Sequence, residues 1–310
     1  MRNPIILFRF HDFFATCRQR IELLRVLNPG VPIYGIYGGP VGGSAEARSA
    51  VGDLVMDLHI ADAPEPLWHW LHPDLDVKHW YRQFGSSIDF DFIFEYEWDL
   101  LTTDALTSIV PDINQDTIAL CSLTRLTPDI EHTWQWTAWP EYRPDYERFL
   151  AYMTNTFGMG PLQYVSHGPG PVLSRRFLDR FAEAEDFELV HSEITYPAYA
   201  QSLGFQVVNN NFRLSAVTDP REDEYFNSDS KMISYERIAS EFVKRDGRRA
   251  FHPVRYPVAI AQLLDQVRVE LSESQASLHA IHESRAWRTV TRLRKLKQHV
   301  TVGRRTLGRD

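Results

Sequence analysis

Residues 89–99 read Asp-Phe-Asp-Phe-Ile-Phe-Glu-Tyr-Glu-Trp-Asp, and this alternation predicts a β-strand in the middle of the chain. Every even position in the stretch is aromatic, whereas the last three odd positions are Glu95, Glu97 and Asp99. One face of the strand therefore carries three carboxylates, spaced about 7 Å apart from one to the next. Such charges repel unless a cation or water screens them, and hard divalent cations take carboxylate ligands. Two interpretations stay open here, a cation site and a solvated acidic face on an edge strand.

The segments before this strand have the apolar spacing of alternating strands and helices. We expect strands at Ile5–Phe10, Val31–Tyr37 and Leu54–Leu58, and helices at Thr16–Leu27 and Pro64–Leu71. This β-α-β-α order favours an α/β fold with a mostly parallel central sheet and helices on both faces. The turn at residues 38–43 contains neither a phosphate-binding loop nor a dinucleotide fingerprint.

The second half of the chain is expected to add further helices, a last strand and a helical extension. The predicted elements are helices at Pro144–Asn155, Ser174–Glu185, Tyr196–Leu203 and Val258–His282, a strand at Phe205–Val208, and a polar loop at Asp219–Ser230. We therefore expect one α/β domain over residues 1–256 and a C-terminal helical extension over residues 257–310.

The composition is that of a soluble globular protein, with 44% hydrophobic and 24% charged residues. The two cysteines, Cys17 and Cys121, suggest no disulfide framework, so a reducing, cytoplasmic compartment is expected. No apolar run is long enough for a transmembrane helix, and the first residues resemble a strand more than a signal peptide. Residues 284–310 hold nine Lys or Arg and one acid, a net +8, which leaves −16 on the other 283 residues. An acidic body argues against a nucleic-acid partner.

Glu97-Trp98-Asp99 at the end of the acidic strand resembles the Asp-x-Asp motif of glycosyltransferase-A enzymes. In that family the motif holds Mn²⁺ or Mg²⁺ against the diphosphate of a nucleotide-sugar donor. The Glu at the first position departs from the pattern. The resemblance implies a Rossmann-like glycosyltransferase-A domain, and it implies metal ligands at Glu97, Asp99 and His252, the last within Phe251-His252-Pro253.

Two further motifs follow in the order that the family has them. The segment from His167 to Arg175 resembles the glycine-rich loop between donor and acceptor sugars, with Gly168, Gly170, Ser174 and Arg175 as its expected contacts. Ser192-Glu193 resembles the acidic motif that supplies the catalytic base of inverting members, so Glu193 is the predicted base. Each motif also has a structural interpretation. Gly168 and Gly170 fit an ordinary turn, Glu193 fits an acid at a helix N-terminus, and His252 fits a surface histidine.

Donor and acceptor contacts are expected around these motifs. Open α/β sheets bind ligands beyond the carboxyl ends of their strands, which favours residues just after the first strand. The predicted donor contacts are Arg9, His11, Glu95, Glu97 and Arg255. Trp136 and Trp139 belong to an aromatic-rich segment that could stack on an acceptor sugar or pack in the core.

The function implied is transfer of a sugar from a nucleotide-sugar donor to a glycan or lipid-linked acceptor, with metal assistance and with inversion. A catalytically silent relative or a carbohydrate-binding protein is the alternative, kept open by the Glu at position 97. A sugar nucleotidyltransferase fits less well, because Phe10–Phe14 takes the place of the glycine- and basic-rich loop of those enzymes.

The basic tail predicts contact with a membrane. Residues 284–300 lack Gly and Pro, and as a helix they would gather five apolar side chains within about 120° beside a basic arc, with Trp287 off the apolar stripe. Basic amphipathic helices bind anionic membrane surfaces. The segment also resembles the Ser-Arg-x-Trp-Arg ends of bacterial glycosyltransferases that make surface glycans. We therefore expect peripheral association with the inner face of the membrane, with docking on the acidic body or a disordered tail as alternatives.

Overall fold

The computed structural model describes residues 1–258, apart from 62–67, 214–222 and 228–230, together with residues 269 and 276. Met1–Glu241 and Asp246–Val258 form one compact unit, and Phe242–Arg245 with Ala259–Asp310 form a second. The first unit contains the seven-stranded central sheet. The predicted helix at Val258–His282, the basic tail and most of the predicted loop at Asp219–Ser230 lie outside the described residues. No described helix combines the length and the apolar character needed to cross a membrane.

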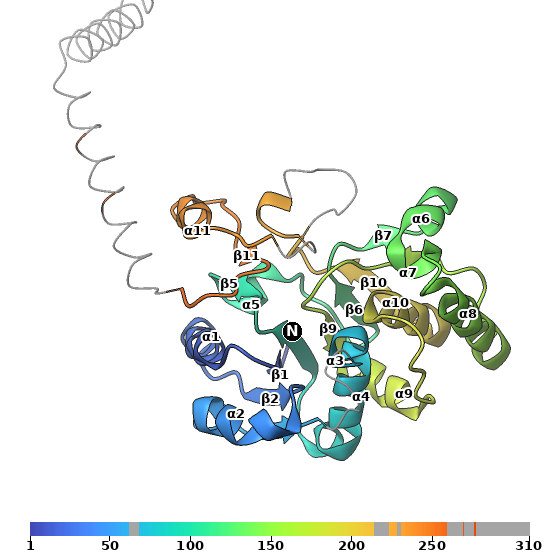
Figure 1. Ribbon diagram of the computed structural model, residues 1–310, viewed down its shortest axis with the longest axis horizontal. Helices are drawn as coiled ribbons and strands as arrows, with labels where there is room; N and C mark the ends of the chain where they lie inside the picture. Colours follow the sequence, from blue (N-terminus) through green and yellow to red (C-terminus); the bar gives the residue numbers. More distant parts are fainter. Residues whose placement is uncertain (62–67, 214–222, 228–230, 259–268, 270–275, 277–310) are drawn as a thin grey trace, which may run out of the picture. The chain divides into compact units, whose positions relative to one another are not determined.

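A seven-stranded sheet forms the centre of this unit, in the order β10-β6-β9-β4-β1-β2-β3 (Figure 1). Strands β4, β1, β2 and β3 pair in parallel, and so do β10 and β6. Strand β9 lies between these two groups and runs antiparallel to both β4 and β6. The predicted α/β fold with a mostly parallel sheet is therefore confirmed. The strands are β1 (Pro4–Phe10), β2 (Ile33–Tyr37), β3 (Leu58–Ile60), β4 (Phe92–Glu97), β6 (Thr117–Leu120), β9 (Val172–Ser174) and β10 (Gln206–Asn209).

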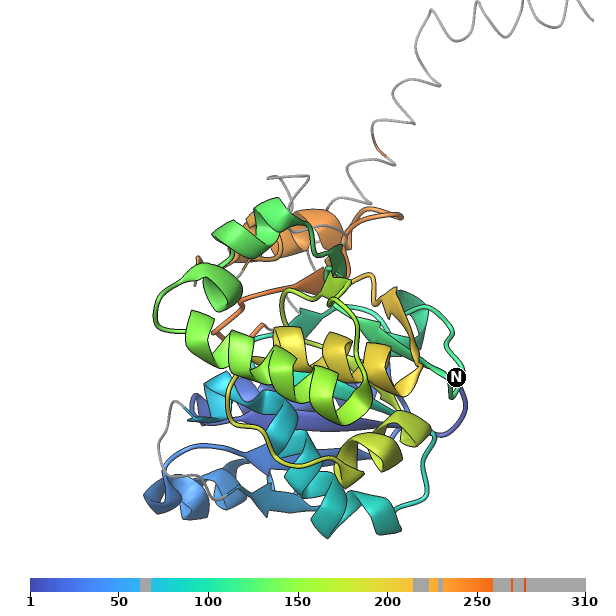
Figure 2. The ribbon, with the colours of Figure 1, turned by 90° about the vertical axis from the view of Figure 1, so that its right-hand side faces the viewer.

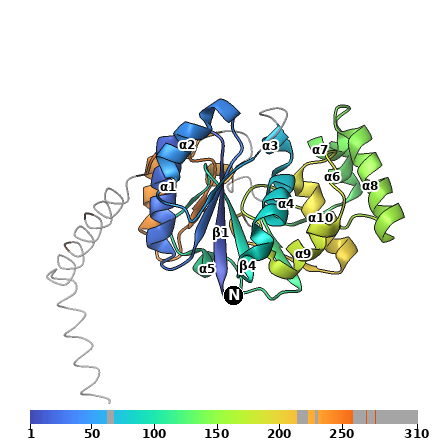
Figure 3. The same ribbon diagram turned by 90° about the horizontal axis from the view of Figure 1, so that it is seen from below.

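Helices cover both faces of the sheet, and each face has its own apolar core (Figure 3). Helices α1 (Phe14–Leu27) and α2 (Ser44–Val51) lie on one face, where Ile6 and Phe8 of β1 pack. Helices α4 (Pro73–Gln83), α9 (Arg175–Glu183) and α10 (Ser192–Leu203) lie on the other, where Ile5 and Leu7 pack. The period of two in β1 therefore turns Arg9 towards the second face.

Shorter elements surround this core. Helix α8 (Arg143–Phe157) runs beside α10, as the green and yellow helices of Figure 2 show. Strand β5 (Leu101–Thr102) pairs with β11 (Ala250–Phe251), and β7 (Thr124–Arg125) pairs with β8 (Tyr164–Val165). The remaining helices are α3 (Trp68–Leu71), α5 (Leu106–Ile109), α6 (Pro128–Thr133), α7 (Gln135–Ala138) and α11 (Tyr235–Phe242).

Two sequence predictions and one of the two interpretations of the acidic stretch need correction. The acidic stretch is no edge strand, because β4 lies between β9 and β1 in the sheet. The third strand is Leu58–Ile60 instead of Leu54–Leu58, since Leu54 N bonds back to Val51 O in a turn after α2. Helix α10 begins at Ser192, four residues before the predicted start, because the His191 side chain accepts a hydrogen bond from Glu193 N and caps it.

Candidate active site

The carboxylates of the acidic stretch lie at the carboxyl end of β4, on the same face as Arg9. Phe92, Phe94 and Tyr96 belong to the apolar core on the α1 side, so the odd positions 93, 95 and 97 point to the opposite face. The register pairs Arg9 with Glu97 on the adjacent parallel strand β1. The predicted alternation of aromatic and acidic faces is thereby confirmed.

Arg9 lies at the centre of a buried cluster of charged side chains on this face. Its Nη1 lies 2.7 Å from Glu95 Oε1 and 3.4 Å from Glu97 Oε1. Its Nη2 lies 3.3 Å from Asp76 Oδ2 of α4 and donates to the His69 carbonyl at 3.0 Å. One guanidinium therefore contacts three carboxylates from two elements and compensates part of their charge in the buried interior.

Glu95 and Glu97 differ in what remains open to a ligand. Tyr196 of α10 donates its hydroxyl to Glu95 Oε2 at 3.0 Å, and the Glu95 side chain is only 1% exposed, so almost none of it is open to a ligand. Burial raises the pKa of Glu95 to about 7 against the opposing effect of Arg9. The Glu97 side chain is 31% exposed and keeps an accessible oxygen. Glu97 is therefore the carboxylate of this pair that can contact a ligand.

The three predicted metal ligands come together. Glu97, Asp99 and His252 each offer one ligand atom, and these atoms lie within 4.8 Å of one another. His252 reaches the site because β11 pairs with β5, which follows β4 directly, and because Val254 N donates to Asp99 O at 2.7 Å. Residues far apart in the sequence are thus joined by backbone pairing just beyond the acidic strand.

The ligand cluster holds opposite charges in close contact. His252 Nε2 lies 3.3 Å from Asp99 Oδ1, and Arg255 Nε lies 3.3 Å from Asp99 Oδ2. Burial alone would raise the pKa of Asp99, but His252 and Arg255 outweigh it and lower that pKa to about 2. Burial likewise disfavours charged His252, yet Asp99 and Glu97 raise its pKa. His252 Nδ1 faces the Asn227 carbonyl at 2.8 Å, an outer contact of the kind that orients histidine ligands.

Glu193, the predicted base, lies in the first turn of α10. Its Oε1 accepts from Gly168 N and its Oε2 from Trp136 Nε1, both at 2.7 Å. Pro197 has no N–H to bond the Glu193 carbonyl, which accepts from Ser166 N at 3.0 Å instead. The proline therefore leaves the Glu193 carbonyl free to bond Ser166, the residue just before the glycine-rich loop. Burial raises the pKa of Glu193 to about 7, against the two hydrogen bonds, so its charge changes near neutral pH.

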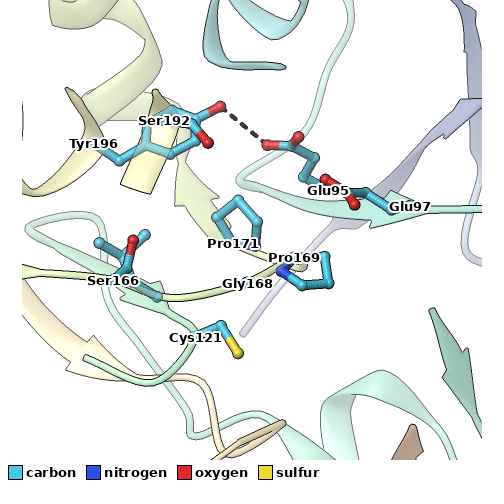
Figure 4. A pocket seen from close by; sticks show the side chains of 10 residues that line it. Glu95, Glu97, Cys121, Ser166, Gly168, Pro169, Pro171, Ser192 and Tyr196 are labelled. Carbon is cyan, nitrogen blue, oxygen red and sulfur yellow. Dashed lines mark hydrogen bonds between the residues drawn. The ribbon is translucent and has the colours of Figure 1, made fainter. Parts of the chain in front are cut away.

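The glycine-rich loop needs glycine at both predicted positions. Gly168 and Gly170 have φ values of 106° and 86°, in the region that side chains disfavour. A Cβ at Gly170 would lie 2.4 Å from the Phe212 ring. The loop forms one wall of a pocket, and Figure 4 shows Glu95 and Tyr196 meeting beside it. The pocket is lined by Glu95, Glu97, Leu120, Cys121, Ser166, Gly168, Pro169, Pro171, Ser192 and Tyr196.

Two of the predicted loop contacts lie away from this site. Ser174 pairs with Phe92 at the opposite end of β4, where its hydroxyl caps α9 by accepting from Phe177 N. Arg175 follows it and stacks over the Phe90 ring with its guanidinium 5.0 Å from the ring centre. Both residues have structural roles because the three-residue strand β9 carries the chain from the loop to the amino-terminal end of β4.

The remaining predicted contacts are aromatic residues, and they differ in burial and in the rings that they contact. His11 sits edge-on to Trp98 at the carboxyl end of β1, 5.5 Å between ring centres. The ring centre of His167 lies 4.7 Å from that of Trp134, and burial lowers the pKa of His167 to about 4. Trp136 is buried and stacks on His191, whereas Trp139 is half exposed.

Sequence reasoning missed Asp76, His69 and Tyr196, which complete the buried cluster around Arg9. Asp76 binds Arg9 and also His69 Nδ1, at 2.7 Å. The sequence does hold a signal for Asp76. It lies four residues before Trp80 and so on the same face of α4, and an acid on an apolar helix face needs a partner. No pattern pointed to Tyr196, whose partner Glu95 lies on another element.

No protein-family model matches the chain, and no curated protein matches it. Similar solved structures include the galactosyltransferase LgtC in complex with donor and acceptor sugar analogs, with a TM-score of 0.38 and 13% identity over 70% of this chain and 81% of that one. The apo structure of the bifunctional glycosyltransferase WbbM has a TM-score of 0.39 and 9% identity over 81% of this chain and 46% of that one. Apo mouse xyloside xylosyltransferase 1 has a TM-score of 0.32 and 10% identity, over 65% and 81%. All three are glycosyltransferases, and at this degree of likeness the function has to be argued from this chain's own side chains.

Proposed function

We propose that the chain is a metal-assisted glycosyltransferase, which moves a sugar from a nucleotide-sugar donor to a hydroxyl of a glycan or lipid-linked acceptor. One observation carries the proposal: the pocket is lined by Glu97, one of three potential metal ligands, and by Gly168, whose N–H donates to Glu193. Glu193 is a carboxylate with a pKa of about 7. Pairing a cation site with a base suits displacement at a carbon that bears a diphosphate leaving group.

The residues of the cluster fit a hard divalent cation. Two carboxylates and one imidazole suit Mn²⁺, and the oxygen ligands also suit Mg²⁺. The 3.3 Å contact of His252 with Asp99 brings two of these ligand atoms to one point, where a cation would take the place of the proton between them. A bound cation would neutralise the charge that develops on the leaving nucleoside diphosphate.

The chain's own residues would then divide the work around the donor. Arg9 binds three carboxylates, so in this proposal it orients Glu97 and does not contact the donor directly. His11 and Arg255 flank Asp99 at the carboxyl ends of β1 and β4, where they are placed to meet the nucleotide and its phosphates.

Glu193 is the proposed general base. It would accept the proton of the acceptor hydroxyl while the new carbon–oxygen bond forms at the anomeric carbon and the bond to the diphosphate breaks. A pKa near 7 keeps a carboxylate basic enough for this task and still largely ionised at slightly alkaline pH. Direct attack by the acceptor implies inversion at the anomeric carbon.

The test is a thermal-shift screen of nucleotide sugars with Mn²⁺, followed by a donor-hydrolysis assay on each sugar that binds. A ligand at a hundred times its dissociation constant stabilises the folded state by about 2.7 kcal/mol, which such a screen detects. We expect at least one nucleotide sugar to stabilise the protein and to be hydrolysed, with both effects dependent on the metal and lost in Asp99→Ala. Stabilisation without hydrolysis would favour a binding protein, and no response to any nucleotide sugar would refute the proposal.

A further inference from the structure

Trp70 of α3 is an exposed aromatic side chain that its neighbours hold in place. Its relative exposure is 55%, although tryptophan is usually well buried. Its ring centre lies 5.6 Å from that of Trp136 and 5.9 Å from that of His191. Trp136 and His191 are themselves stacked, 4.5 Å apart with 4° between their planes. Trp70 thus rests on a packed aromatic pair and keeps more than half of its surface in solvent.

The contacts around Trp70 connect it to Glu193, the proposed base, and to Glu97, a proposed metal ligand. On one side, Trp136 donates to Glu193 Oε2 at 2.7 Å. On the other, the carbonyl of the preceding residue His69 accepts from Arg9, whose other terminal nitrogen lies 3.4 Å from Glu97. Trp70 is therefore linked to the proposed base through Trp136, and to a proposed metal ligand through His69 and Arg9.

We propose that Trp70 is the platform on which a pyranose ring of the acceptor stacks, with one ring hydroxyl directed to Glu193. The inference rests on the proposed function and names its acceptor class as a carbohydrate with an apolar ring face. An indole suits this ligand because the C–H groups of one pyranose face form an apolar surface, while the hydroxyls at the ring edge stay hydrated. Trp136, which the sequence offered as a platform, instead supports Trp70 and holds Glu193.

The supporting contacts explain why Trp70 could act without large rearrangement. Trp136 is 3% exposed, and its indole N–H is engaged by Glu193, so it cannot present a face to a sugar. Trp139 is exposed but makes no ring contact that ties it to Glu193 among the described residues. A platform held by packing gives an acceptor a defined position, which is what in-line attack requires.

The experiment is saturation-transfer difference NMR on the full chain with four probes: the methyl glycosides of β-glucose, β-galactose, α-mannose and N-acetyl-β-glucosamine. Glycerol, a polyol without a ring face, is the ligand control. The variants are Trp70→Ala, Trp70→Phe and Phe84→Ala, the last an exposed aromatic that directly follows α4. We expect at least one glycoside to receive saturation on the protons of one ring face. Its dissociation constant should rise about tenfold in Trp70→Ala, as loss of a stacking contact predicts. It should rise far less in Trp70→Phe and stay unchanged in Phe84→Ala.

The outcomes separate this inference from the proposed function. If no glycoside gives a signal that depends on Trp70, the platform is wrong, and equal weakening in Phe84→Ala or binding of glycerol would also overturn it. Metal-dependent hydrolysis of a nucleotide sugar by the unsubstituted chain, lost in Asp99→Ala, tests the proposed function without any acceptor. The platform can therefore fail while the transferase proposal stands.

Discussion

Glu193 links the local structure to a measurable pH dependence. Its pKa is raised to about 7, and a general base works only when it is deprotonated. Activity should therefore rise with pH to a plateau, with its midpoint near pH 7, and fall about tenfold for each unit below that midpoint. The measurement is kcat/KM for sugar transfer between pH 5 and 9, since this ratio reports the free enzyme.

Glu193→Gln should remove that acidic limb and lower turnover by about 10²–10⁴-fold, the usual contribution of a general base. Donor binding, measured by calorimetry, should change little because the donor is held at the metal side. Glu183→Gln, at an exposed position of α9, is the matched control. A Glu193→Gln enzyme with normal turnover and an intact acidic limb would exclude this residue as the base.

His252 allows a test of the metal site that does not depend on activity alone. His252→Ala should raise the Mn²⁺ concentration for half-maximal activity by at least about tenfold, because even outer-shell changes cost 10–100-fold in metal affinity. Binding of Mn²⁺ followed by electron paramagnetic resonance should weaken in parallel. His132→Ala, at an exposed position of α6, should behave as wild type. An unshifted metal titration would leave His252 as a structural residue of the Asp99 cluster.

Among the elements, the glycine-rich loop gives a prediction about stability. Gly170→Ala meets two costs: about 1–2 kcal/mol for a side chain at positive φ, and about 1–3 kcal/mol for pressing against the buried Phe212 ring. Gly158→Ala, after α8, meets only the first, since nothing lies within 4 Å of its added Cβ. Urea denaturation should therefore rank Gly170→Ala well below Gly158→Ala. Equal midpoints would show that Phe212 moves aside without cost.

Elements with a clear local period were predictable from the sequence, whereas those fixed by distant partners were not. The alternation of the acidic strand and the helical spacing of α1 and α8 are properties of single segments. The start of α10 and the position of β3 depend on a cap and on a turn after α2. Antiparallel β9, only three residues long, carried no periodic signal that could place it between β4 and β6.

The same distinction applies to the site. Glu97, Asp99 and His252 could be grouped in advance because a family pattern orders them along the chain, and the structure does bring them together. The compensation of Glu95 and Glu97 by one arginine could not, because it depends on the register of β1 against β4. Ser174 and Arg175 were assigned to the site because the segment from His167 to Arg175 resembles a loop motif, and that resemblance does not account for the direction of β9.

At the scale of the whole molecule, the charge distribution makes the last prediction. The first 283 residues carry −16 and residues 284–310 carry +8, so the two parts have opposite affinities for an anionic surface. Each Lys or Arg near an anionic membrane contributes about 1 kcal/mol, enough for the tail to outweigh repulsion of the acidic body if the body stays beyond the screening length. The tail lies outside the described residues, so this prediction rests on the sequence alone.

The membrane prediction is tested by co-sedimentation of the full chain, and of a chain ending at Glu283, with vesicles of phosphatidylglycerol and phosphatidylcholine. The full chain should bind at low salt and be released by added salt, and the shortened chain should stay in solution. Equal binding of the two chains, or binding of neither, would contradict a membrane role for the tail.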